Sequence, residues 1–186
     1  MVVSTDLRGD RFSDFEPPPR HGRGLRWDGS IGGVWTLLAE ISDPEIPVVS
    51  LLDLGIIRDV AHTPEGVTVT LTPTYAGCPA TEVICADVKA VLAEAGIAHV
   101  TVRQQLTPAW TTDWISAKGR VALQDYGIAP PCAVAAERTQ TLQFKPACPR
   151  CASHQTVCLS AFGATPCKAL YRCETCREPF DFFKPL

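Results

Sequence analysis

The sequence predicts an α+β protein in which a two-layer domain of order α-β-β-α-β precedes a small, β-rich module held by a metal ion. Two observations lead to this expectation. Between residues 30 and 128, apolar residues recur in turn at helical and at strand spacing. In the last 39 residues, Cys148 to Leu186, two C-x-x-C pairs are separated by 21 residues, a pattern typical of a four-thiolate metal site.

The first helix is predicted from an N-cap residue, a helix-ending proline and apolar residues at helical spacing, and the hairpin after it from alternating apolar and polar residues. Ser30 is the expected N-cap, and Pro44 marks the end because the residue before a proline is pushed out of the helical region. The apolar stripe of the helix comprises Val34, Leu37, Leu38 and Ile41. Strands are expected over residues 56–61 and 67–72, and in the second of these valine and leucine alternate with threonine.

A second helix, a third strand and a third helix complete the domain. Pro79 suits the first helical position because its missing N–H would have no partner there, and Gly96 ends that helix. Gly127 lies where the third helix needs a left-handed C-terminal cap. An antiparallel hairpin and a third strand, covered by helices on one face, form a two-layer α+β domain.

Four segments follow from this reading. Residues 1–29 carry balanced charge and three consecutive prolines, and they are expected to form a flexible tail. Residues 30–128 form the α+β domain and residues 129–141 a linker. Residues 142–186 form the metal-binding module, which we expect to be a zinc ribbon.

Composition narrows the classes of function. No apolar run reaches the roughly 18 residues of a membrane-spanning helix, and the N-terminus lacks the apolar core of a secretory signal. A cytoplasmic location is therefore expected, where nine cysteines favour metal ligands or reactive thiols over disulfides. Residues 31–139 carry a net charge of −6 and residues 140–186 a net charge of +3, so neither nucleic acid nor a membrane is an expected partner.

The four-cysteine set is expected to hold one tetrahedral ion. Two C-x-x-C turns can aim four sulfurs at one point, as structural Zn²⁺ prefers; iron in a rubredoxin-like site or an Fe–S cluster remains an alternative. Six aromatic residues are expected to pack around the ion, namely Phe144, Phe162, Tyr171, Phe180, Phe182 and Phe183. Cys158 is expected to be a core residue, whereas Cys167, six residues before Cys173, could exchange into the site. The expected ligands are Cys148, Cys151, Cys173 and Cys176.

A second candidate site lies around Cys78. A cysteine at a helix N-terminus gains thiolate character from the free N–H groups and the helix dipole, although Cys78 could equally be a small residue in a tight turn. Asp43 and Glu45 could bind a cation or simply form the turn around Pro44, and Thr74 places a hydroxyl beside the cysteine loop. Cys85 is two helical turns further on, too far to share a mononuclear site. With four scattered histidines and no nucleophilic triad, no catalytic residue is expected.

Three ordered motifs resemble the iron–sulfur cluster assembly domain family, which includes SufT. They are Asp43-Pro44-Glu45-Ile46-Pro47, Asp53 to Val60, and Thr72-Pro73-Thr74-Tyr75-Ala76-Gly77-Cys78-Pro79. From about Val34 to the C-terminus the chain also resembles the PaaD (PaaJ) family. The motifs that carry this second resemblance are Trp110, Trp114, Tyr126 to Pro131, the two C-x-x-C turns, Cys167 to Cys173, and Arg177-Glu178-Pro179-Phe180.

These resemblances imply an accessory subunit of the phenylacetyl-CoA oxygenase (epoxidase) of aerobic phenylacetate catabolism. The subunit would not be catalytic itself, but would assemble or maintain the iron or Fe–S centres of the complex. Cys78, Asp43, Glu45 and Thr74 would handle transient iron or an Fe–S cluster, and zinc would be structural. The implied partners are oxygenase subunits or their reductase, the iron–sulfur assembly machinery, and a second copy of the chain.

Two other roles stay open at this point. An adaptor that bridges oxygenase components would use the loop Trp110 to Trp114 as an interface. An electron-transfer protein would carry iron at the four cysteines.

Overall fold

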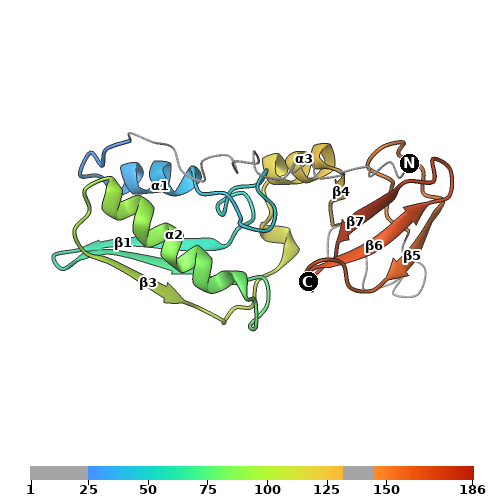
Figure 1. The fold of residues 1–186 in the computed structure, drawn as a ribbon. Helices are drawn as coiled ribbons and strands as arrows, with labels where there is room; N and C mark the ends of the chain where they lie inside the picture. Colours follow the sequence, from blue (N-terminus) through green and yellow to red (C-terminus); the bar gives the residue numbers. More distant parts are fainter. Residues whose placement is uncertain (1–24, 132–144) are drawn as a thin grey trace, which may run out of the picture.

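The computed structural model describes residues 25–131 and 145–186, and it confirms the predicted α+β fold with a β-rich C-terminal module (Figure 1). We call residues 25–127 the first domain and residues 145–186 the ribbon. The elements of the first domain are α1 (Ile31–Ala39), β1 (Ile57–Thr63), β2 (Gly66–Leu71), α2 (Ala80–Glu94), β3 (Val100–Gln104), η1 (Thr112–Trp114) and α3 (Ala117–Tyr126). Within these described ranges, no helix is long and apolar enough to cross a membrane.

The first domain has two layers, with α1 and α2 covering one face of a three-stranded sheet (Figure 1). Strand β2 is central, antiparallel to β1 and parallel to β3, which returns beside it after α2. Its valines and its leucine are buried, while its threonines lie half-buried on the other face. This alternation is the one that the sequence predicted, because successive strand residues point to opposite faces.

Caps define the ends of the helices. The Ser30 hydroxyl accepts a hydrogen bond from the Gly33 N–H, so Ser30 is the N-cap of α1 as predicted. Gly127 ends α3 with φ +95°, the left-handed cap that a glycine adopts without steric cost. For α2, however, the N-cap is Pro79. Cys78 therefore lies one residue before the cap, in the turn that leads into the helix.

The ends of the predicted tail and linker differ from expectation. Trp27 belongs to the first domain: its backbone N–H donates to Ala95 O at 3.1 Å and its ring meets His62 edge-on. The tail prediction is thus wrong for residues 25–29, and residues 1–24 lie outside the described part. Most of the predicted linker, residues 132–141, also lies outside it.

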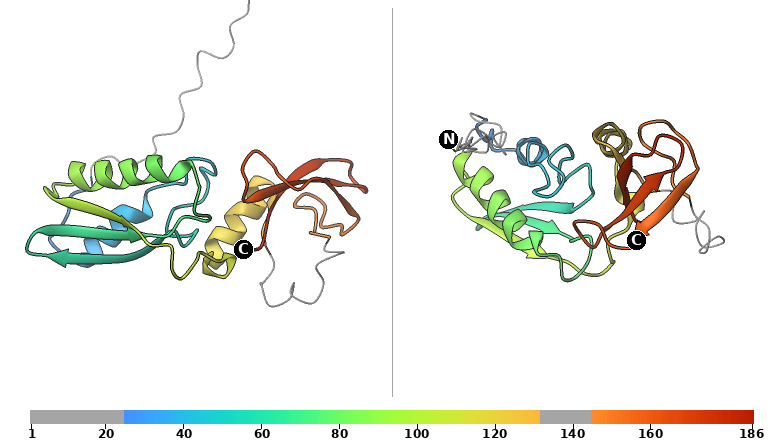
Figure 2. Two further views of the ribbon diagram at one scale, coloured as in Figure 1. Left: turned by 90° about the horizontal axis from the view of Figure 1, so that it is seen from below. Right: turned by 45° about the vertical axis from the view of Figure 1, so that its right-hand side comes forward.

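The ribbon supplies three strands of a four-stranded sheet of order β4-β7-β6-β5, and the fourth, β4, precedes it in the chain. The strands of this sheet are β4 (Ile128–Ala129), β5 (Thr156–Ser160), β6 (Lys168–Cys173) and β7 (Pro179–Phe183). Strand β4 follows directly after α3, the last helix of the first domain, and pairs in parallel with β7 of the ribbon. The two modules lie end to end with α3 between them (Figures 1 and 2).

Aromatic packing fixes the ribbon against the first domain. Trp110 is 4% exposed, donates its indole N–H to Leu54 O at 3.0 Å, and packs on Phe183 with ring centroids 5.9 Å apart. Phe183 and Cys167 thereby belong to the core of the first domain, although both lie in the ribbon. Within the loop Trp110 to Trp114, the Trp110 ring is therefore buried in this chain and is not available to another component.

Candidate metal centre and thiol cavity

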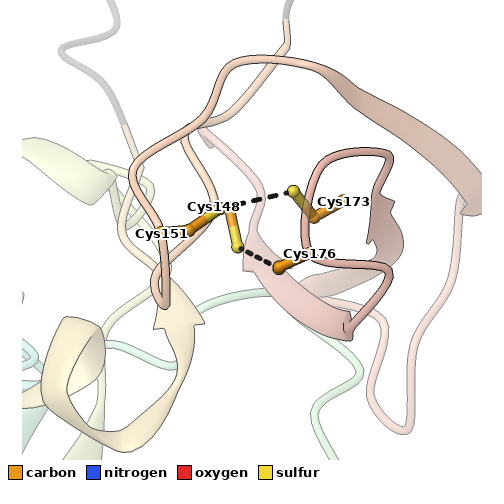
Figure 3. Close-up of side chains that lie close together, drawn as sticks. All are labelled: Cys148, Cys151, Cys173 and Cys176. Atoms are coloured by element: carbon orange, nitrogen blue, oxygen red, sulfur yellow. Dashed lines mark hydrogen bonds between the residues drawn. The ribbon is translucent and has the colours of Figure 1, made fainter.

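The four predicted cysteine ligands converge on one point (Figure 3). Their sulfurs all lie within 4.8 Å of one another, with Cys148 Sγ 3.7 Å from Cys176 Sγ and Cys151 Sγ 3.6 Å from Cys173 Sγ. A tetrahedral ion with metal–sulfur bonds of about 2.3 Å requires sulfurs about 3.8 Å apart. The arrangement is therefore close to that of a four-thiolate metal site.

Two similar turns build this site. In the first, Ala152 N–H donates to Cys148 O at 2.9 Å and Ala152 adopts φ +57°. In the second, Arg177 occupies the same position after its cysteine pair and adopts φ +68°. The Ser153 and Thr175 hydroxyls, 2.8 Å apart, link the two turns. Each turn thus orients its pair of sulfurs toward the point that the other pair also faces.

Backbone hydrogen bonds favour the thiolate form of Cys173, the form that a metal needs. The N–H of Cys176, followed by that of Thr175, lowers the pKa of Cys173 to about 6, although desolvation acts in the opposite direction. A thiolate, not a thiol, ligates metal. In Cys151, by contrast, the hydrogen bond from the Ser153 backbone is outweighed by desolvation and the neighbouring Cys173 sulfur, which raise the pKa to about 12. The donor set suits a metal cation, and Cys173 is the ligand whose thiolate form the protein itself favours.

The ribbon has a small core of its own. Of the predicted aromatic residues, Phe180, Phe182 and Tyr171 pack beside the metal cysteines. Phe162 is 66% exposed, and Phe183 packs on the first domain instead. Cys158 is exposed on the edge strand β5, so the prediction of a core residue is wrong; the apolar run around it does not face a second layer.

A second site is the cavity that we call the thiol cavity, with an empty volume of about 350 Å³ including its open mouth. Its polar lining contains all four residues that the sequence singled out, together with one cysteine from the ribbon; its apolar lining includes Phe183. Among the described residues that line it, none is basic. The polar lining residues are Asp43, Glu45, Thr74, Cys78 and Cys167.

The acidic turn is shaped by Asp43 itself. Its Oδ1 accepts hydrogen bonds from the N–H groups of Glu45 at 2.9 Å and Ile46 at 2.8 Å. This is the turn-forming role that the sequence left as one of two options. The same turn places the Asp43 carboxylate, 7% exposed, and the exposed Glu45 at the thiol cavity, so one role does not exclude the other.

Burial governs the electrostatics of the cavity. Desolvation raises the pKa of Asp43, against the two backbone hydrogen bonds and the charge of Lys168. Desolvation and then the neighbouring Asp43 raise the pKa of Glu45. Burial, followed by the nearby Cys78 sulfur, raises the pKa of Tyr75 to about 12, so Tyr75 keeps its proton near neutral pH.

Cys167 is the residue whose place sequence reasoning missed. It precedes β6 while Cys173 ends that strand, so the six intervening steps of extended chain separate the two cysteines by about 20 Å. Exchange of Cys167 into the four-cysteine site is therefore excluded. A strand predicted over the residues between Cys167 and Cys173 could have shown that the two cysteines lie too far apart to share a site.

Known proteins match both modules. Residues 33–103 match the family described as iron-sulfur cluster assembly protein, and residues 133–184 match the PaaD zinc beta ribbon domain. A relative from Escherichia coli (strain K12), described as a subunit of a "Putative 1,2-phenylacetyl-CoA epoxidase", is 48% identical over 81% of this chain and 90% of its own length. The chain belongs to the PaaD family.

Other relatives of this PaaD-family chain match about half of it. An Fe-S protein maturation auxiliary factor from Porphyromonas gingivalis is 37% identical over 47% of the chain and 84% of its own length. A crystal structure of DUF59, a domain of unknown function from Bacillus anthracis, covers 50% of the chain and 89% of its own, with 29% identity and a TM-score of 0.45. The predicted pairing of an iron–sulfur assembly domain with a PaaD zinc ribbon is confirmed by the two family matches.

Proposed function

We propose that this PaaD-family protein is an accessory subunit of a phenylacetyl-CoA epoxidase complex and acts, in the cytoplasm, in assembling or maintaining the iron or Fe–S centres of that complex. It is not proposed to catalyse oxygenation. The observation that carries the proposal is the thiol cavity, where Cys78, Asp43, Glu45 and Thr74 meet in the part of the chain that matches iron–sulfur assembly proteins.

The lining chemistry supports a cationic cargo. Thiolate sulfur suits soft or borderline metals and carboxylate oxygen suits harder ones, so a mixed set is compatible with Fe²⁺. No basic residue is among its described lining, and Lys168, whose charge reaches Asp43 and Glu45, pairs with Asp181 instead, so the cavity suits a cation better than an anion. The proposed partners are the oxygenase subunits or the reductase, and the assembly machinery that supplies the iron.

Replacing Cys78 tests this role. Cys78→Ser is expected to leave the fold intact and to lower the iron content of the co-expressed epoxidase to less than half, because the thiol that receives the metal is lost. Iron per epoxidase would be measured by elemental analysis after separation from the accessory protein.

Cys85→Ser is the matched control, since Cys85 is also half-buried on the α2 side of the core but does not line the cavity. Unchanged iron loading with Cys78→Ser would overturn the proposal. Co-purification in a fixed ratio without any effect on iron would favour the adaptor role instead.

We further propose that the four-cysteine site holds structural Zn²⁺, supported by the tetrahedral sulfur geometry and the match to a zinc ribbon family. Ferric iron in the same four thiolates would absorb visible light, whereas Zn²⁺ does not. Elemental analysis is expected to give one zinc per chain in a colourless preparation. A coloured protein with one iron would favour electron transfer.

A further inference from the structure

We propose that Cys167 of the ribbon is the second sulfur ligand of the Cys78 site, so that the two modules together hold one thiophilic divalent cation of the Fe²⁺ type. This inference rests on the proposed function, which it deepens by naming the ligand set and the class of ion. The proposed cation site differs from the zinc site in its residues, in its place in the fold and in its expected affinity for metal.

The ribbon fixes Cys167 at the cavity. Its carbonyl accepts a hydrogen bond from the Lys184 N–H at 2.9 Å, which ties the start of β6 to the end of β7. Its sulfur lies 3.0 Å from the Thr165 hydroxyl. The residue is 5% exposed, yet it is one of the residues that line the thiol cavity. The backbone hydrogen bond from Lys184 thus holds Cys167 at the thiol cavity.

Two sulfurs from separate modules then share one cavity with two carboxylates. Of the nearby cations, Lys168 pairs with Asp181 at 3.1 Å, on the ribbon side. The cavity therefore combines anionic or ionisable oxygen and sulfur donors with a lining free of basic residues in its described part. Two thiolates select borderline and soft ions over Mg²⁺ and Ca²⁺ more strongly than one.

The spacing of the donors points to exchangeable cargo. Among the described residues, only the four cysteines of the proposed zinc site form a group of three or more candidate ligands whose donor atoms all lie within 4.8 Å of one another. The donors of the thiol cavity thus lie further apart than in a closed cage. A site that must draw its ligands together on binding holds its ion less tightly than a preformed one, which suits transfer to a client.

The test uses the full chain with zinc in the ribbon, titrated anaerobically with Co²⁺ as a spectroscopic substitute for Fe²⁺. One Co²⁺ is expected to bind with sulfur-to-metal charge-transfer absorption while the zinc content stays at one. X-ray absorption at the cobalt edge then counts sulfur ligands at this site alone, and two sulfurs are expected in the unsubstituted protein. This measurement needs no variant to fold.

Variants separate the inference from the proposed function. Cys78→Ser and Cys167→Ser are each expected to halve the charge-transfer absorption and to weaken binding by about tenfold or more, whereas Cys85→Ser changes neither. Wild-type absorption and affinity in Cys167→Ser, or one cobalt-bound sulfur in the unsubstituted protein, would overturn the inference and leave the role of Cys78 intact. Absence of Co²⁺ binding, or no effect of Cys78→Ser, would overturn both.

Discussion

Loss of the ribbon metal is expected to unfold residues 145–186 and to expose Cys78. The core cluster of the ribbon has five buried members, of which two are metal cysteines and a third, Ala129, belongs to β4; this is too few to stabilise the module alone. Binding of a structural zinc contributes about 10–16 kcal/mol in comparable modules, so its removal has a larger effect than any single substitution in the core. We expect this outcome with Cys173→Ser or after treatment with a chelator.

Unfolding of the ribbon also opens the thiol cavity, because Cys167 and Phe183 of the ribbon form part of its wall. Once the ribbon unfolds, Cys78 loses that cover, and its alkylation is expected to become several-fold faster. Mass spectrometry of alkylated peptides measures this rate residue by residue. Cys85, which the thiol cavity does not include, serves as the internal reference.

Cys158→Ser is the matched control, since it removes a ribbon thiol that is exposed and lies outside the metal site. It is expected to keep the metal, the ribbon fold and the slow alkylation of Cys78. A ribbon that stays folded in Cys173→Ser, as judged by amide exchange over residues 145–186, would contradict metal-dependent folding.

Trp110→Ala is expected to destabilise the protein by about 3–5 kcal/mol, the cost of emptying a buried tryptophan site. The indole fills the junction between the modules, where it packs on Phe183 and donates to Leu54 O. Its loss should therefore also loosen the ribbon from the first domain. Denaturant unfolding gives the free energy, and amide exchange around β7 reports on the docking.

Two further variants separate the contribution of the indole hydrogen bond from that of ring packing and provide a control at an exposed ring. Trp110→Phe keeps a ring but leaves the buried Leu54 carbonyl without its donor, with an expected cost of about 1–3 kcal/mol. Phe162→Ala removes an aromatic ring that is 66% exposed and should change stability by less than about 0.5 kcal/mol. Equal stabilities of Trp110→Ala and the unsubstituted protein would show that the junction is not a stabilising contact.

Local rules account for what the sequence predicted correctly. The cap at Ser30, the left-handed Gly127 and the alternation along β2 each depend on a few neighbouring residues, and the structure confirms them. The four metal cysteines were predictable for the same reason. Each C-x-x-C turn is a local structure that orients two sulfurs, and a single ion is enough to bring two such turns together.

The thiol cavity was only partly predictable. Its first-domain residues were found as motifs, but nothing in their spacing shows that Asp43 and Cys78 line the same cavity, since the intervening turns, strands and loops must first be arranged around β2. That Cys167 also lines this cavity could not be predicted at all from the motifs. It depends on β6 pointing one end at the metal and the other at the first domain.

The sequence by itself therefore determined the order of the two modules, the helices and strands of the first domain and the four-thiolate site, because each follows from short-range periodicity, caps and turn geometry. Tertiary structure alone decided that Trp110 is buried, that Cys158 is exposed and that Cys167 meets the Cys78 site. These outcomes depend on which faces pack together across the junction. Packing of that kind joins residues far apart in the chain, and no local pattern encodes it.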